Sequence, residues 1–146
     1  MKKIIAIVMF ALVLNACVTG KKMAKIPKLK FSNFSFEETL NKATKENKIV
    51  FIDFWASWCG PCKRMEEDVL SDPALINYFN KNFINYKMDA EAEEAILPKI
   101  NYDVRALPAY VWVKPNGQMI HVYRGTTTIS NFIKQGETAV KKYKLN

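Results

Sequence analysis

The sequence predicts a single α/β domain, with a β-sheet flanked by helices. Segments with apolar residues at helical spacing alternate along the chain with short apolar runs rich in β-branched and aromatic residues. The resulting order is helix, strand, helix, strand, helix, β-hairpin, helix, which is typical of a layered α/β protein. Residues 31–146 are enough chain for one hydrophobic core, and no internal repeat or low-complexity segment interrupts them.

The individual elements follow from local signals. Ser35 and Glu38 have the spacing of a capping box, and apolar residues at helical spacing continue to about Asn47. Residues 49–54 form an apolar run expected of a strand buried on both faces, with Asp53 as its one charged residue. The later elements predicted are a helix from the cysteine motif to about Leu70, a short helix from Asp72-Pro73, a strand from Phe83 to Met88, a helix from Ala90 to about Ile100 interrupted by Pro98, strands over Ala109–Val113 and Gln118–Tyr123 joined by a KPNG turn, and a last helix through Phe132 to Tyr143.

Residues 1–16 are predicted to be a signal peptide of the lipoprotein type. Two lysines precede an apolar run from Ile4 to Leu14, which is shorter than a membrane-spanning helix but fits the core of a secretory signal. The letters LNAC, ending at Cys17, resemble the lipobox of bacterial lipoproteins, where cleavage leaves a cysteine that becomes lipid-modified. An ordinary signal peptide with an incidental cysteine is the alternative.

Cysteine counting favours lipid on Cys17. The chain has three cysteines, and an exported protein with an odd number would carry one unpaired thiol. If Cys17 carries lipid, Cys59 and Cys62 remain as a single pair, and more than one acyl chain would hold the protein stably on a membrane. We therefore expect a lipid-anchored protein of the cell envelope that faces the periplasm, or the outer face of the membrane in a single-membrane cell.

The positive charge belongs to the N-terminal segment rather than to the domain. The formal net charge is +8, but seven of the 22 basic residues precede Phe31. Residues 31–146 then carry 15 basic and 14 acidic side chains. We expect residues 17–30 to be a solvated basic tether beside lipid head groups, and we expect no nucleic-acid partner.

The motif WCGPC, residues 58–62, admits three interpretations. A structural zinc site needs four ligands, and beyond the pair only His121 is a ready candidate. A structural disulfide across two residues closes a very small loop and removes little entropy from the unfolded chain. A redox dithiol fits the placement best, because Cys59 lies where a helix begins and the unpaired amides there stabilise a thiolate.

The dithiol interpretation assigns separate roles to the two sulfurs. Lys63 and Arg64 add positive charge one turn beyond Cys59, which should lower the pKa of its thiol and make it the attacking sulfur. Cys62 lies one turn deeper in the helix and should be shielded until it attacks the mixed disulfide and releases the product. Gly60 and Pro61 complete the turn between the cysteines.

The segment VFIDFWASWCGPCKRM closely resembles the active-site segment of the thioredoxin family, and the resemblance extends from about Phe36 to Lys142. It implies the thioredoxin fold, with a central mixed β-sheet flanked by helices. The stretch EEDVLSDPALINYFNKNFINYKMDAE is less similar to small cytosolic thioredoxins. It looks more like membrane-associated relatives, including the C-terminal domain of the transmembrane electron conduit of bacterial envelopes.

The resemblance also assigns residues around the cysteines. Asp53 matches the family's buried aspartate, and Lys87 matches the lysine that approaches it. Burial should raise the pKa of Asp53, so that it exchanges a proton with Cys62; a purely structural Asp–Lys pair is the alternative. Leu107-Pro108 matches the dipeptide with a cis-proline opposite the cysteines, and a trans-proline at a strand start is the alternative.

We expect substrates to dock beside the cysteines. The backbone of Leu107 would pair with a substrate segment, and Trp58 would lie on the surface next to Cys59. Trp55 is equally compatible with the core. Gly125 matches a family glycine beside the active site. His121 receives no role.

These observations predict a thiol–disulfide oxidoreductase that reduces disulfides of exported proteins. We expect no cofactor, a monomer, and a transmembrane thiol reductase as electron supplier. A disulfide oxidant or isomerase of the same fold is one alternative. A tethered binding or chaperone module without turnover is another, although it would not need both cysteines.

Overall fold

The structure is a computed structural model that describes residues 27–145. The predicted signal peptide, Cys17 and most of the tether lie outside the described residues. No described helix combines the length and apolar character needed to cross a bilayer.

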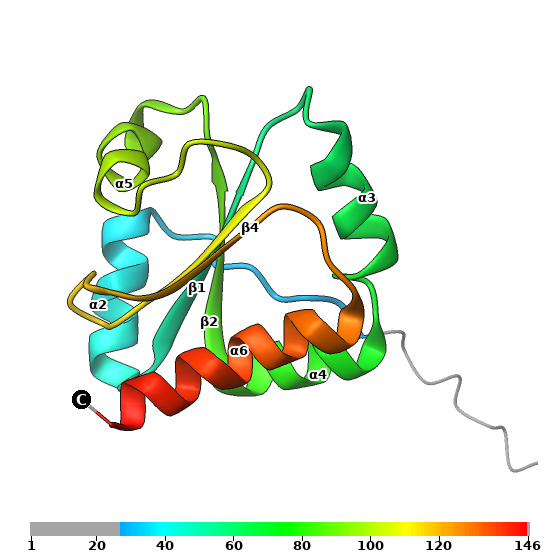
Figure 1. The fold of residues 1–146 in the computed structure, drawn as a ribbon. Helices are drawn as coiled ribbons and strands as arrows, with labels where there is room; N and C mark the ends of the chain where they lie inside the picture. Colours follow the sequence, from blue (N-terminus) through cyan, green and yellow to red (C-terminus); the bar gives the residue numbers. More distant parts are fainter. Residues whose placement is uncertain (1–26, 146) are drawn as a thin grey trace, which may run out of the picture.

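The described chain forms a sheet with helices on both faces (Figure 1). The predicted Ser35–Glu38 capping box is present at the start of the first helix. The elements in chain order are α2 (Phe36–Glu46), β1 (Ile49–Trp55), α3 (Gly60–Asp68), α4 (Pro73–Asn82), β2 (Phe83–Asp89), the 3-10 turn η2 (Glu93–Ala95), α5 (Ile96–Asn101), β3 (Ala109–Val113), β4 (Met119–Arg124) and α6 (Ile129–Lys144).

The sheet is mixed, with strand order β2-β1-β3-β4. Strands β1 and β2 are parallel and place Asp53 opposite Lys87. Strand β3 runs antiparallel to β1 and places Tyr110 opposite Asp53, and β4 is antiparallel to β3. Because register partners point to the same face of a sheet, Asp53, Lys87 and Tyr110 share one face.

Each face of the sheet has its own apolar core. Side chains of β1–β3 on one face pack with α2 and α5, through residues such as Ala43 and Tyr102. On the other face Phe51 and Trp112 pack with α3, α4 and α6, through residues such as Met65 and Phe79. Figure 1 shows α2 and α5 on one side of the sheet and α3, α4 and α6 on the other. The predicted α/β fold is confirmed.

The predicted helix from Ala90 is wrong in its first half. The N–H of Ala90 donates to the carbonyl of Trp55 at 2.8 Å, and Asp89 accepts from the N–H groups of Glu91 and Ala92. These bonds extend the end of the β1–β2 pair and leave no helical ladder. The helix α5 begins only at Ile96. Pro98 lies in its first turn, where a missing N–H costs nothing, so it does not interrupt the helix.

The last residues before Phe31 contact the domain. The N–H of Lys30 donates to Asn80 Oδ1 at 2.9 Å, and Asn80 Nδ2 donates to the carbonyl of Lys28 at 2.9 Å. Phe31 forms an isolated parallel bridge with Asn85 of β2. The chain therefore enters the domain along the outer edge of β2.

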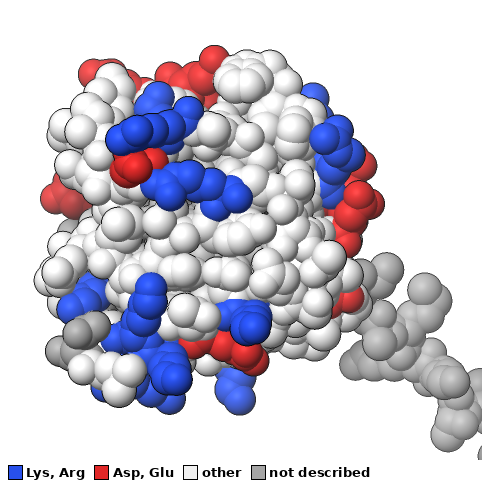
Figure 2. All heavy atoms as spheres, in the orientation of Figure 1, with Lys and Arg blue, Asp and Glu red and all other residues white. Residues whose placement is uncertain are grey.

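Charged side chains are dispersed over the face of the domain that Figure 2 presents. Figure 2 shows blue and red side chains interspersed around a broad uncharged band on the face it presents. Basic residues also occupy the last turn of α6, at Lys141, Lys142 and Lys144.

Candidate active site

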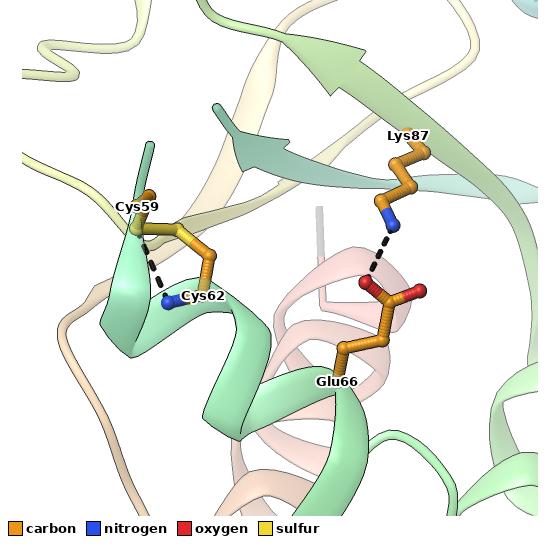
Figure 3. Close-up of a disulfide and its surroundings, with 4 residues drawn as sticks. All are labelled: Cys59, Cys62, Glu66 and Lys87. Carbon is orange, nitrogen blue, oxygen red and sulfur yellow. Dashed lines mark hydrogen bonds and ion pairs between the residues drawn. A yellow bond between two sulfur atoms is a disulfide. The ribbon is translucent and has the colours of Figure 1, made fainter. Parts of the chain in front are cut away.

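The two cysteines lie at the first turn of α3, directly after β1 (Figure 3). They form a disulfide with an S–S distance of 2.02 Å. Cys59 is the N-cap residue, and its Sγ accepts a hydrogen bond from the N–H of Cys62 at 3.1 Å. A backbone donor and the positive end of the helix therefore both point at Cys59, as expected for the sulfur that becomes the thiolate.

Gly60 and Pro61 are the first two residues of α3. Pro61 is tolerated there because the first N–H groups of a helix have no partner within it. A Cβ built on Gly60 would lie 3.8 Å from Nη1 of Arg64, so the Arg64 guanidinium lies near the motif. Both Lys63 and Arg64 are exposed.

Both cysteines are covered in the disulfide form. Cys62 is 7% exposed, which agrees with its predicted shielding, and Cys59 is 2% exposed. Burial therefore does not distinguish the two residues. The helix N-terminus does, because its amide hydrogen bond goes to Cys59.

The Leu107–Pro108 peptide bond is cis, as the resemblance implied. Leu107 packs against an apolar cluster formed by Ala56 and the two cysteines. The N–H of Gly125 donates to the carbonyl of Pro108 at 2.9 Å, which joins the start of β3 to the end of β4. The Leu107 backbone has no hydrogen bond to another described residue. That leaves its N–H and carbonyl available for pairing.

Trp58 is a surface residue, 67% exposed. Its Nε1 donates to Glu91 Oε1 at 2.8 Å, and a pocket of about 290 Å³ lies between Trp58, Glu91 and Leu107. Trp55 is half-buried, with Lys87 Nζ 4.6 Å from its ring centroid. Sequence reasoning missed Glu91, because a contact across 33 positions leaves no local signal.

Asp53 is buried, with 4% of its surface exposed. Burial raises the pKa of its carboxyl to about 7; the charge of Lys87 opposes this shift and that of Glu66 adds to it. A carboxyl that titrates near neutral pH can both accept and donate a proton under physiological conditions.

Lys87 lies opposite Asp53, as the resemblance implied, but its ion pair is with Glu66. Its Nζ lies 2.8 Å from Glu66 Oε2 (Figure 3). No ion pair or hydrogen bond joins the Asp53 carboxylate to another described residue. The Asp53–Lys87 pair of the structural alternative is therefore not formed as a direct contact. Sequence reasoning missed Glu66, although its place four residues after Cys62 puts both on one face of α3.

The described residues offer no metal site. No group of three His, Cys, Asp or Glu side chains within 27–145 is arranged to hold an ion. His121 Nε2 lies 2.7 Å from Gln135 Oε1, and the ring stacks on Trp112. Burial lowers the pKa of His121. The cysteine pair is bonded to itself rather than to a third ligand.

A family model described as Thioredoxin matches residues 27–136, about three quarters of the chain. This chain belongs to the thioredoxin family. A thioredoxin from Malassezia sympodialis is 34% identical over 91 residues, with 60% of this chain and 79% of that protein covered. The thiol-disulfide oxidoreductase ResA of Bacillus subtilis is 28% identical over 137 residues, covering 73% and 75%. Thioredoxin-1 of Drosophila melanogaster is 32% identical over 74 residues, but the match spans only 64% of its length.

Solved structures of the family superpose on the domain. A Bacteroides thetaiotaomicron protein described as a disulphide-isomerase has 32% identity and a TM-score of 0.71, with 81% of this chain and 98% of that chain covered. The oxidised C-terminal domain of DsbD from Neisseria meningitidis has 23% identity and a TM-score of 0.61, covering 76% and 98%, and shares the fold. Together with the Cys59–Cys62 disulfide, the family identifies a thiol–disulfide oxidoreductase site.

Proposed function

We propose that this protein is a membrane-anchored reductant of disulfides in exported proteins. The observation that carries the proposal is the Cys59–Cys62 pair at the start of α3, beside Leu107, with the buried Asp53 in the preceding strand β1. A binding module without turnover would have no use for a second cysteine poised to close a disulfide with the first.

The reaction transfers two electrons and needs no cofactor. The Cys59 thiolate attacks one sulfur of a substrate disulfide, a mixed disulfide forms, and the first substrate thiolate leaves. Cys62 then loses its proton to Asp53 and attacks Cys59 Sγ. The Cys59–Cys62 bond forms, and the second substrate sulfur leaves as a thiolate that takes up a proton. The substrate is reduced and the protein is oxidised.

The residues between the cysteines support the reductive direction. A side-chain donor at either position would stabilise the Cys59 thiolate, favour the reduced protein and make an oxidant. Gly60 and Pro61 have no such donor. The dithiol therefore yields its electrons readily, even in an oxidising compartment.

Docking of the substrate is assigned to the surface around the disulfide. The free Leu107 backbone offers strand-like hydrogen bonds, and the exposed Trp58 ring offers apolar contact beside Cys59. Both groups accept a protein segment without reading a particular sequence, which suits a general reductant.

Lipid on Cys17 would hold the domain beside its electron donor. A reductant in an oxidising compartment must be recharged, which requires a transmembrane thiol reductase in the same envelope. Tethering both proteins to one membrane raises their effective concentration for each other. The basic segment 17–30 would keep the domain close to anionic lipid.

The direction is tested by the redox state of Cys59 and Cys62 in growing cells, measured by acid quench and thiol alkylation. We expect a largely reduced pair that becomes oxidised when the membrane electron supply is removed. A fully oxidised pair in unperturbed cells would contradict the reductive direction and favour an oxidant. An isomerase, the class named for the Bacteroides thetaiotaomicron relative, is recognised by catalytic refolding of scrambled ribonuclease.

The anchor is tested separately with Cys17→Ser. We expect the variant to leave the detergent phase or to keep its signal peptide uncleaved. Unchanged detergent partitioning together with an unchanged mass of the mature N-terminus would exclude the lipid anchor. That result would not contradict the proposed disulfide exchange by Cys59 and Cys62.

A further inference from the structure

Glu66 lies on α3, the helix that begins at the two cysteines, but it is not part of the apolar core. It follows Cys62 by four residues, one helical turn, and points to the same side of α3. Its carboxylate pairs with Lys87 Nζ at 2.8 Å, as Figure 3 shows between α3 and β2. The Lys87 side chain is 22% exposed and the Glu66 side chain is 55% exposed, so the lysine end of the pair is shielded from water and the carboxylate end is open to it.

Lys87 has a second possible partner in Asp53. The β1–β2 register places the two residues directly opposite each other, and both side chains point to the α3 face. A lysine facing a buried carboxylate would ordinarily neutralise it. Here the ammonium is instead held by Glu66, and it also lies over the rings of Trp55 at 4.6 Å and Phe31 at 5.8 Å.

We propose that Glu66 is a positioning residue that keeps the Lys87 ammonium from forming an ion pair with Asp53, so that Asp53 remains a strong enough base to take the proton of Cys62. The inference rests on the proposed proton transfer between Asp53 and Cys62. It deepens that function by assigning a third residue to the same step.

The groups that face Asp53 come from three elements. Lys87 on β2 and Glu66 on α3 act on it with opposite charge, and Tyr110 on β3 is its register partner across the sheet. Burial raises the pKa of Tyr110 well above its usual range, so the phenol stays neutral wherever Asp53 titrates. The cysteines at the start of α3 are uncharged as a disulfide and add one negative charge when Cys59 is a thiolate. Asp53 is therefore tuned chiefly by where the Lys87 ammonium points.

Removing the Glu66 charge should lower the pKa of Asp53 in two ways. The carboxylate no longer repels a negative charge on Asp53, and Lys87 becomes free to turn toward Asp53. Both changes favour the ionised form and lower the pKa of Asp53. A carboxylate with a lower pKa is a weaker base, so the rate of Cys62 attack should fall on the high-pH plateau, where Asp53 is ionised in both proteins.

The experiment is the pH dependence of mixed-disulfide resolution in single turnover, combined with a carbon-13 NMR titration of the Asp53 carboxyl. Glu66→Gln is compared with Glu67→Gln, which removes the neighbouring exposed carboxylate on the same helix. We expect Glu66→Gln to move both the kinetic inflection and the Asp53 titration down by about one pH unit. Glu67→Gln should leave both at the wild-type position.

A double-mutant cycle with Lys87→Met tests whether Glu66 acts through Lys87. If Glu66 acts chiefly through Lys87, Glu66→Gln should have a much smaller effect on the Asp53 titration in the Lys87→Met background. An Asp53 titration in Glu66→Gln that coincides with wild type would overturn the inference.

The inference and the proposed function fail separately. Suppose that Asp53→Asn abolishes the inflection in the pH profile of mixed-disulfide resolution but Glu66→Gln leaves it at the wild-type pH. The role of Glu66 is then wrong, and the proton transfer between Asp53 and Cys62 stands. If Asp53→Asn retains the inflection, the proton transfer is wrong and the role of Glu66 falls with it.

Discussion

Phe51 and Asp53 are two residues apart in β1 and point to the same face of the same sheet, yet their surroundings are opposite. Phe51 is fully buried among rings, and its centroid lies 4.9 Å from that of Phe79 and 5.1 Å from that of Trp112. Asp53 is almost as buried, at 4% exposure, but faces Lys87 and the charge of Glu66. One strand thus passes from an aromatic region to a charged one within about 7 Å of rise.

The aromatic region supports the fold. Phe79 and Phe132 stack at 5.3 Å, and Tyr110 meets Phe132 edge-on at 4.6 Å, so α4, α6 and β3 join through ring contacts. Such contacts bury much apolar area and favour one packing arrangement.

The charged region lowers the stability of the fold, and the proposed proton transfer depends on it. A carboxyl with a pKa near 7 is less stable when ionised in the fold than in water, so Asp53 weakens the native state at neutral pH. The proposed function uses this same carboxyl as the proton acceptor for Cys62. Substitutions in the aromatic region should therefore lower the free energy of unfolding with little effect on disulfide exchange. Substitution of Asp53 should raise the free energy of unfolding and slow exchange.

The largest effect is expected from the cysteines. Cys59→Ser should abolish disulfide exchange, because no thiolate remains to attack the substrate. In Cys62→Ser the Cys59 thiolate can still attack, but mixed disulfides should accumulate because the second sulfur that releases the product is missing. Both variants are checked by insulin reduction and by non-reducing gels after acid quench. If Cys62 alone reacts rapidly with a small alkylating agent in the reduced protein, the roles are reversed.

Phe79→Ala tests the aromatic region. Removing a fully buried ring should cost about 3–5 kcal/mol of unfolding free energy, measured by denaturant titration. The exchange rate per folded molecule should stay within a factor of about two, because the ring contacts neither sulfur. A large loss of exchange rate in the folded fraction would show that the two regions are coupled.

Asp53→Asn tests the charged region through the pH dependence of the free energy of unfolding. The folded pKa of about 7 lies above the ordinary value of 3.8, so the native state holds a proton that the unfolded state has lost between these pH values. The contribution of Asp53 to stability is fully present below about pH 4 and is lost as pH rises toward 7. Asn does not titrate, so the variant should gain stability relative to wild type across this window, by up to about 4 kcal/mol at neutral pH. A stability difference that does not depend on pH would contradict the raised pKa.

The smallest effect is expected at Trp58. The ring is 67% exposed and its one hydrogen bond goes to Glu91 on the surface. Trp58→Ala should change the unfolding free energy by no more than about 0.5 kcal/mol. It should raise KM for a protein disulfide without changing kcat, since the ring is assigned to docking. An unchanged KM would remove Trp58 from the docking surface.

The sequence predicts those parts of the molecule that depend on local signals. The Ser35 cap, the strand around Asp53 and the helix start at Cys59 are each encoded by a few neighbouring residues, and all three are confirmed. The cis bond at Pro108 follows from a family motif, and it is present as well.

The errors arise where distant residues compete. Residues after Asp89 have helical composition, but the N–H of Ala90 bonds to the end of β1, and this tertiary contact prevents a helix there. Lys87 lies opposite Asp53 and lowers the pKa of its carboxyl, as the family match implies. The match gives no sign of Glu66, which lies on a different element and forms an ion pair with the Lys87 ammonium. Neither competition is visible from spacing along the chain.

The most direct test of the central claim is the rate at which Cys62 resolves a preformed mixed disulfide on Cys59, measured by quenched flow between pH 5 and 9 in wild type and Asp53→Asn. The wild-type rate should rise with pH through an inflection near 7, where Asp53 becomes able to accept a proton. In Asp53→Asn that inflection should be absent, and the rate near neutral pH should fall by about a hundredfold. Superimposable profiles for the two proteins would contradict the account and reduce Asp53 to a structural residue.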